Sequence, residues 1–129
     1  MTPKQIYNYI EKQCELYKQP NEKIPGQGGW HFFKKVYRNG TCWAWYGEAC
    51  QGKLRIDFCV DADESVREKV KSFLNGRYET KTPRSTFHAF FVNGVNFESL
   101  NMEILGEAML KYLKFMNKDF YEIEKILQE

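Results

Sequence analysis

The sequence has no apolar run long enough to cross a membrane, so it excludes a membrane-spanning protein and we expect no membrane partner. Its opening residues, Met1 to Gln5, contain no apolar segment of the kind that directs export, and we expect a cytoplasmic protein. Hydrophobic residues make up 43% of the 129 residues and aromatic residues 16%, which argues against disorder. A chain of this length suits one domain, residues 1–129.

The cysteines and histidines form no recognisable metal or disulfide pattern. The sequence has no Cys-x-x-Cys pair and only two histidines, so a zinc site would need ligands whose spacing matches no common zinc-binding motif. Cys42 and Cys50 lie on one predicted strand, about 25 Å apart at strand rise, which is too far for a disulfide. We therefore expect reduced, packing cysteines, no metal site and no cofactor. The cysteines are Cys14, Cys42, Cys50 and Cys59.

The most specific pattern lies between Trp30 and Val60, where three apolar and aromatic runs are separated by Asn39-Gly40 and Gln51-Gly52. Asn-Gly is the strongest short hairpin signal because a type I′ turn needs positive φ at both central residues. Gln-Gly is a weaker form of the same signal. We therefore predict a three-stranded antiparallel meander with two-residue turns.

Counting back from these turns sets a register and sorts the side chains onto two faces. The predicted register places Trp43 opposite both Val36 and Val60, all on the face that we expect to be buried. A slip by one residue would exchange the faces and bury charged side chains, which is costly. The predicted core face comprises Trp43, Trp45, Leu54, Ile56, Phe58 and Val60.

The opposite face of the predicted meander mixes aromatic and charged side chains. One interpretation is an ordinary solvated face with weak cross-strand ion pairs. The other is a binding platform, because aromatic side chains on a rigid sheet bring contact area at low entropy cost. On that interpretation the partner-binding residues are His31, Phe33, Tyr37, Tyr46, Glu48, Arg55 and Asp57.

Helix signals come before the meander and after it. Thr2 is expected to cap a helix that begins at Pro3, with Gln5 completing a capping box. The glycine-rich stretch from Pro20 to Gly29 lacks the Lys-Ser/Thr ending of a phosphate-binding loop, and we assign it a connector role. Asp63 is the expected N-cap of a short amphipathic helix.

The remaining pattern completes the predicted fold. Thr86 to Val92 reads as a fourth strand of the same sheet, ended by an Asn93-Gly94 turn. Apolar residues at helical spacing from about Ser99 predict one long helix to the end of the chain. Together these elements predict a two-layer α+β fold, with a mainly antiparallel sheet of meander plus fourth strand and the long C-terminal helix packed on one face.

The net charge of +2 conceals a basic stretch. Residues 66–86 carry six basic and two acidic side chains, a local excess of four. Such a stretch is compatible with nucleic acid, which Arg77, Lys81 and Arg84 would contact. If all four charges met phosphates, the slope of log affinity against log salt would be only about −3 to −4. We therefore prefer a protein partner and keep nucleic acid as the alternative.

One short pattern suggests catalysis. Glu79-Thr80-Lys81 with an upstream acid at Asp57 or Asp61 is similar to the arrangement of metal-dependent nucleases, in which the lysine orients the attacking water. The triplet is common by chance, however, and a predicted helix separates it from the acid. No nucleophile is set beside a base. We expect a non-enzymatic binding module, with a nuclease that uses Asp57, Glu79 and Lys81 as the alternative.

Two families are similar to the chain in their order of elements. Lys53 to Phe58, running into Val66 to Leu74, and the later Leu113-Lys114-Phe115 resemble a small α+β domain of unknown function appended to restriction-endonuclease-like proteins. That resemblance implies a defence or anti-defence context. The helix start at Met1-Thr2 resembles the MmcQ/YjbR-like double-wing domains, but the basic and tryptophan positions expected after their middle helix are absent. We transfer no functional residue from either family.

Overall fold

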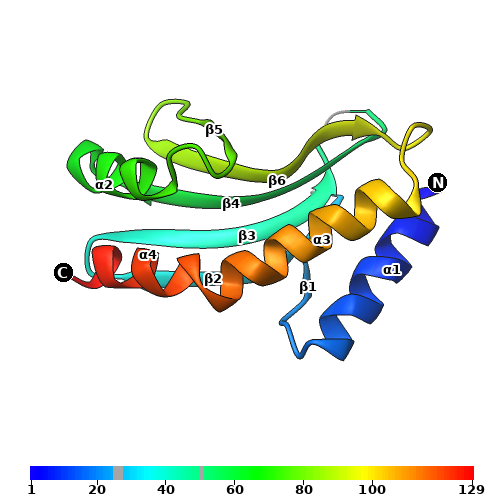
Figure 1. Cartoon of the computed structure of the whole chain (residues 1–129), viewed down its shortest axis with the longest axis horizontal. Coiled ribbons are helices and arrows are strands. Elements are labelled where there is room, and N and C mark those ends of the chain that lie inside the picture. Colours follow the sequence, from blue (N-terminus) through cyan, green and yellow to red (C-terminus); the bar gives the residue numbers. More distant parts are fainter. Residues whose placement is uncertain (25–27, 50) are drawn as a thin grey trace.

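In the part of the chain that the computed structural model describes, residues 1–24, 28–49 and 51–129, six antiparallel strands form one sheet and four helices lie against it (Figure 1). The order across the sheet is β1-β2-β3-β4-β6-β5. The strands are β1 (Glu22–Ile24), β2 (Gly29–Tyr37), β3 (Gly40–Glu48), β4 (Lys53–Ala62), β5 (Glu79–Lys81) and β6 (Thr86–Asn96). The helices are α1 (Pro3–Leu16), α2 (Glu64–Leu74), α3 (Met102–Asn117) and α4 (Asp119–Gln128).

The predicted α+β class and antiparallel sheet are confirmed. All four helices contribute their apolar side chains to one hydrophobic core, which they share with one face of the sheet. On β4, near the centre of the sheet, alternate side chains point into this core as predicted, and none of them is exposed: Leu54, Ile56, Phe58 and Val60. No helix within the described ranges is long and apolar enough to span a membrane.

Local signals place the first two helices correctly. The Thr2 hydroxyl accepts a hydrogen bond from the Gln5 backbone N–H at 3.2 Å, and the Gln5 side-chain oxygen accepts one from the Thr2 N–H at 3.0 Å. The predicted capping box therefore satisfies two free donors at the start of α1. Asp63 takes the N-cap position of α2, although its side chain makes no capping hydrogen bond.

The hairpin between β2 and β3 turns one residue earlier than predicted. Tyr37 pairs with Gly40, so the turn residues are Arg38 and Asn39. The pairing moves by two residues, an even number, and Val36 and Trp43 therefore still share a face.

A bulge in β2 between His31 and Phe33 interrupts the alternation of side chains. Phe32 and Phe33 are consequently both buried in the core. The predicted position of Phe33 on an outer platform is wrong, because Phe33 pairs with Ala44, which lies in the core.

The hairpin between β3 and β4 has one more loop residue than predicted. The Ala49 N–H donates to the Lys53 carbonyl oxygen at 2.9 Å, which leaves three residues in the loop instead of two. Trp43 consequently pairs with Cys59, one residue from its predicted partner. Because side chains alternate with a period of two, this single step moves every β3 side chain to the other face relative to β4.

The predicted core face is therefore right on β4 and wrong on β3. Trp43 and Trp45 lie on the face away from the helices. In their place the core contains Cys42, Ala44 and Tyr46. Tyr46 is fully buried, and its hydroxyl donates to Asn21 Oδ1 at 2.8 Å. Its predicted place on an exposed binding platform is wrong for the same reason.

The C-terminal segment forms two helices, whereas the sequence predicted one. α3 ends at Asn117, Lys118 leaves helical geometry with φ of −138°, and α4 begins at Asp119. The Asp119 carboxylate accepts hydrogen bonds from Arg77 Nη1 at 2.7 Å and from the Tyr78 hydroxyl at 2.8 Å. A buried carboxylate needs such partners. They tie the start of α4 to the segment that follows α2.

The sheet is larger than predicted. β1 lies within the predicted connector loop and pairs with β2, and β5 lies within the polar stretch after α2 and pairs with β6. β6 corresponds to the predicted fourth strand but continues to Asn96, through the Asn93-Gly94 pair that was predicted as its end. Residues 25–27 of the predicted loop, and Cys50, lie outside the described residues.

The register predicted from the sequence and the register in the structure place Tyr46 and Val36 on opposite faces, so the two registers can be distinguished by substitution. We expect Tyr46→Ala to lower the free energy of unfolding by about 3–5 kcal/mol, because it removes a fully buried aromatic side chain. Val36 is 78% exposed, and Val36→Ala should change that free energy by less than about 0.5 kcal/mol. Urea denaturation measures both values. The opposite ranking would favour the register predicted from the sequence.

Candidate functional site

The face of the sheet that is turned away from the helices carries the candidate site, and we call it the second face. Its central side chains come from the neighbouring strands β2, β3, β4 and β6. Antiparallel sheets commonly leave one face to solvent, yet at the centre of this one the side chains cover one another. The second face includes Lys34, Val36, Trp43, Trp45, Arg55, Asp57, Cys59, Thr86, His88 and Phe90.

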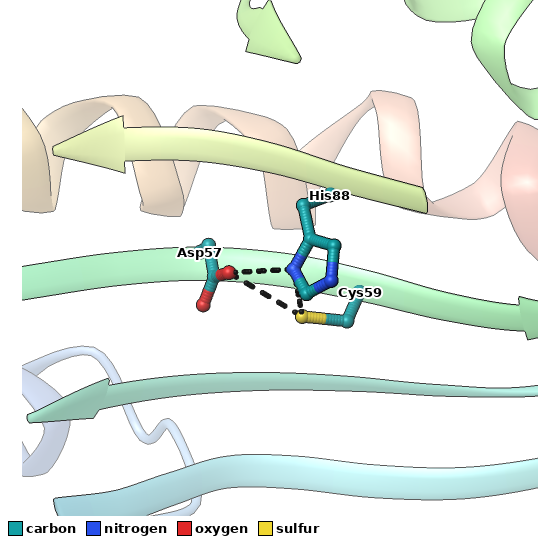
Figure 2. Close-up of side chains that lie close together, drawn as sticks. All are labelled: Asp57, Cys59 and His88. Carbon is teal, nitrogen blue, oxygen red and sulfur yellow. Dashed lines mark hydrogen bonds and ion pairs between the residues drawn. The ribbon is translucent and has the colours of Figure 1, made fainter. Parts of the chain in front are cut away.

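Three polar side chains meet at the centre of the second face, and we call them the polar cluster (Figure 2). Asp57 and Cys59 are two residues apart on β4 and therefore point to the same face. His88 lies opposite Cys59 on β6. His88 Nδ1 lies 2.9 Å from Asp57 Oδ2 and 3.0 Å from Cys59 Sγ, and the thiol donates to the same Asp57 oxygen at 3.4 Å. Asp57 and Cys59 are fully buried, and the His88 side chain is 14% exposed.

Thr86 fixes the protonation of the other His88 nitrogen. The Thr86 hydroxyl donates its single proton to the Pro83 carbonyl oxygen at 3.0 Å and lies 3.1 Å from His88 Nε2. Since that proton is already used, the hydroxyl can only accept from the ring, and Nε2 must carry a proton. Nδ1 is thus the nitrogen that faces the Asp57 carboxylate, to which it either donates a second ring proton or presents a lone pair.

Arg55 separates the polar cluster from solvent. Its Nε lies 3.5 Å from Asp57 Oδ2, and its side chain is 30% exposed. The guanidinium carbon lies 4.7 Å from the centroid of a Trp45 ring and 5.9 Å from that of Phe90. Phe90 in turn stacks on the His88 ring, with centroids 6.0 Å apart. Cation–π attraction to two rings stabilises the guanidinium in this position.

One oxygen of the polar cluster has no hydrogen-bond partner. Asp57 Oδ1 is buried and makes no hydrogen bond within the described residues. Leaving a buried polar atom unpaired costs about 1–3 kcal/mol, and folded proteins rarely do so. Within the described part of the chain, this oxygen therefore lacks a hydrogen-bond donor or a cation.

The polar cluster is not arranged as a catalytic Cys–His pair. Burial, and then the Asp57 carboxylate, raise the pKa of the Cys59 thiol, so it is neutral, whereas nucleophilic cysteines have lowered pKa values. Cys59 exposes no surface to a substrate. It also faces the same His88 nitrogen as Asp57, while a catalytic relay needs the nucleophile and the orienting acid on different nitrogens.

The residues predicted to bind a partner do not form one surface. Phe33 and Tyr46 are core residues. The Tyr37 hydroxyl donates to Glu124 Oε2 at 2.5 Å, which ties it to α4. Glu48 is exposed at the end of β3, where it accepts a hydrogen bond from the Gly52 N–H.

The other three predicted residues lie on the second face. His31 pairs with Trp45 across β2 and β3 and is partly buried. Burial, and then the nearby Lys34, lower the pKa of His31. Arg55 and Asp57 belong to the arrangement described above, but Asp57 is fully buried and acts on a partner only through Arg55.

The residues of the nuclease alternative share the second face without converging. Phe90 pairs with Asp57 on one side and with Glu79 on the other, so a strand separates the two acids by about 10 Å, twice the strand spacing. Lys81 lies in the next row, opposite His88. Among the described residues, no cluster of three or more metal-ligating side chains includes Glu79.

The basic residues of the nucleic-acid alternative are not equivalent. Arg77 pairs with Asp119 at 2.7 Å, and its guanidinium carbon lies 4.7 Å from the Phe73 ring centroid. Lys81 and Arg84 are exposed. One of the three charges is thus compensated within the fold, which reduces the number that can meet phosphates.

The sequence contained only part of the signal for the polar cluster. Alternation along β4 places Asp57 and Cys59 on one face, but His88 follows Cys59 by 29 residues, beyond a helix and a short strand. Its place beside β4 is set by strand order, which no local pattern gives. The sequence predicted no metal site because it does not show that β6 pairs with β4 and brings His88 beside Asp57 and Cys59.

No protein-family model, curated protein or solved structure matches this chain. What bears on its function is the geometry of the second face and of the polar cluster.

The buried thiols provide a test of this geometry. Burial above all raises the pKa of both Cys14 and Cys42 to about 12, and these two and Cys59 are at most 2% exposed. In a Cys50→Ser variant with EDTA, we expect the three thiols to react with Ellman's reagent at least about 100-fold more slowly than in guanidinium chloride, because thiolate is the reactive form. If one of the three thiols reacted fast in the folded Cys50→Ser protein, that result would contradict the burial of these cysteines.

Proposed function

We propose that the chain is a non-enzymatic binding module that engages a protein partner through the second face. The proposal rests on one observation, the assembly of Trp43, Trp45 and Arg55 on a sheet surface against which no described helix buries its apolar side. Tryptophan and arginine are the residue types enriched at the energetic centres of protein interfaces. Because these side chains lie on strands, and the Arg55 guanidinium is held over the Trp45 ring, they lose little conformational entropy on binding.

The side chains around the tryptophans suggest the chemistry of the partner. Val36 is 78% exposed on the same face, and Lys34 lies exposed opposite Trp43. Arg55 adds a second cation beside the Trp45 ring. An aromatic and apolar patch with basic neighbours is complementary to an apolar side chain flanked by acidic ones.

Protein is preferred over nucleic acid because of the charge count. With Arg77 paired to Asp119, the basic stretch offers Lys81 and Arg84 as its exposed predicted contacts. Two phosphate contacts correspond to a salt slope of only about −2, which gives weak binding at physiological salt. The aromatic residues of the second face lie on strands other than the one that carries Lys81.

Substitutions on the second face test the proposal. We expect Val36→Asp and Trp43→Ala each to weaken capture of a partner from a lysate of the source cells by about 10-fold or more, as loss of an interface anchor does. Tyr121→Ala is the matched control, because Tyr121 is 57% exposed but lies on α4, in the helical layer. Circular dichroism verifies that each variant is folded before quantitative mass spectrometry of the captured proteins.

Nuclease treatment of the lysate separates the alternatives. A partner that resists nuclease and is lost with the second-face variants alone supports the proposal. A partner that disappears with nuclease, and on charge reversal of Lys81 and Arg84, would establish the nucleic-acid alternative instead. Cleavage of DNA or RNA in Mg²⁺ or Mn²⁺ that is abolished by Glu79→Ala would contradict the non-enzymatic assignment.

A further inference from the structure

We propose that Asp57, Cys59 and His88 form a binding site for a divalent transition metal ion of the zinc type. This inference goes beyond partner binding and does not depend on it. It also departs from the sequence-based expectation of no metal site.

The three ligand atoms already lie close to the positions that a metal requires. Asp57 Oδ2, Cys59 Sγ and His88 Nδ1 lie within 4.8 Å of one another, with separations of 2.9, 3.0 and 3.4 Å. Tetrahedral zinc, with bonds of about 2.0–2.3 Å, sets its ligands about 3.3–3.6 Å apart. An opening of about half an ångström therefore converts hydrogen-bonding distances into coordinating ones.

His88 is oriented as metal-ligating histidines are. Such a histidine donates its other ring N–H to an oxygen, which fixes the ring and its tautomer. Here Nε2 lies 3.1 Å from the Thr86 hydroxyl, whose own proton goes to Pro83. That chain of bonds keeps a proton on Nε2, so Nδ1, the atom that faces Asp57 and Cys59, is the nitrogen that binds a metal after releasing any proton it carries.

The unpaired Asp57 oxygen is a separate observation that points to a ligand. Asp57 is fully buried, and its Oδ1 has no hydrogen-bond partner within the described residues. A bound cation gives this oxygen a counter-charge, either through bidentate coordination or through a metal-bound water. The described residues supply three ligands, so this oxygen or a water takes the fourth position.

Two cationic side chains face the polar cluster and bear on its charge balance. Arg55 lies 3.5 Å from Asp57, and Lys81 lies opposite His88 on β5. A divalent ion with one carboxylate and one thiolate has no net charge, so it does not add to the positive charge of Arg55 and Lys81. Binding forms the metal–sulfur bond as the Cys59 thiol releases its proton to solvent.

The ligand types select the metal. Thiolate and imidazole favour zinc and the similar ions cobalt(II) and cadmium, whereas magnesium and calcium prefer sites made of oxygen atoms. Cobalt(II) is the useful probe, because a cysteine ligand produces a thiolate-to-cobalt absorption band and the intensity of the visible bands reports four-coordination.

The experiment titrates cobalt(II), and then competing zinc, into the untagged full chain carrying Cys50→Ser. We expect one equivalent to bind, the thiolate-to-cobalt band to appear, zinc to displace it, and zinc to raise the melting temperature. Cys42→Ala is the matched control, because Cys42 lies in the core on the other side of the sheet, and it should retain the band. Cys59→Ser should abolish the band, and Thr86→Val should weaken binding by about 10- to 100-fold.

Circular dichroism and the metal-free melting temperature show whether each variant is folded, and Thr86→Val keeps the test valid if Cys59→Ser does not fold. No thiolate band in the parent protein, or zinc affinity unchanged in folded Thr86→Val, would overturn the proposal and leave a structural Arg55–Asp57–His88 ion-pair network. Because the readout is metal binding by the isolated chain, its failure is distinguishable from failure to capture a partner.

Discussion

The pairing of β4 on both of its sides is the constraint on which the rest of the structure depends. β4 is bonded to β3 along one edge and to β6 along the other. Its alternation directs Ile56, Phe58 and Val60 to the helices and Asp57 and Cys59 to the second face. The two faces of β4 thus contribute to the hydrophobic core and to the polar cluster, respectively. A shift of one residue in the pairing register of β4 would destroy both.

The second face also explains how a charged carboxylate can be buried in a sheet. Removing a carboxylate from water costs several kcal/mol unless partners compensate for it. Asp57 has Arg55 at 3.5 Å and His88 at 2.9 Å, and the aromatic rings of Trp45 and Phe90 hold the guanidinium in place. Such networks stabilise little when weighed against apolar packing, and here one Asp57 oxygen has no hydrogen-bond partner among the described residues. The proposed metal ion would supply the partner that this oxygen lacks.

The helices were predictable because their signals are local. Thr2 and Gln5 define the start of α1 through bonds that span three residues. The apolar spacing of the C-terminal segment was also interpreted correctly, since the residues that follow it are buried: Leu105, Met109, Tyr112, Phe120, Ile123 and Leu127. The break at Lys118 was not predictable, because it accompanies the contact of Asp119 with Arg77, which lies 42 residues away in the sequence. The helical spacing of apolar residues continues across Lys118, so the sequence pattern does not reveal that the helix is interrupted there.

The sequence by itself determined the α+β class, the antiparallel hairpins and the inward side of β4, because composition and alternation act within a strand or a helix. Tertiary structure alone decided which side chains of β3 are buried, since one additional loop residue before Lys53 places Tyr46 in the core and Trp43 on the second face. It likewise decided that His88 joins Asp57 and Cys59, because β6 pairs directly with β4 although α2 and β5 separate the two strands in the sequence. Side-chain alternation is encoded residue by residue, whereas register parity and strand order depend on loop length and on contacts between distant segments.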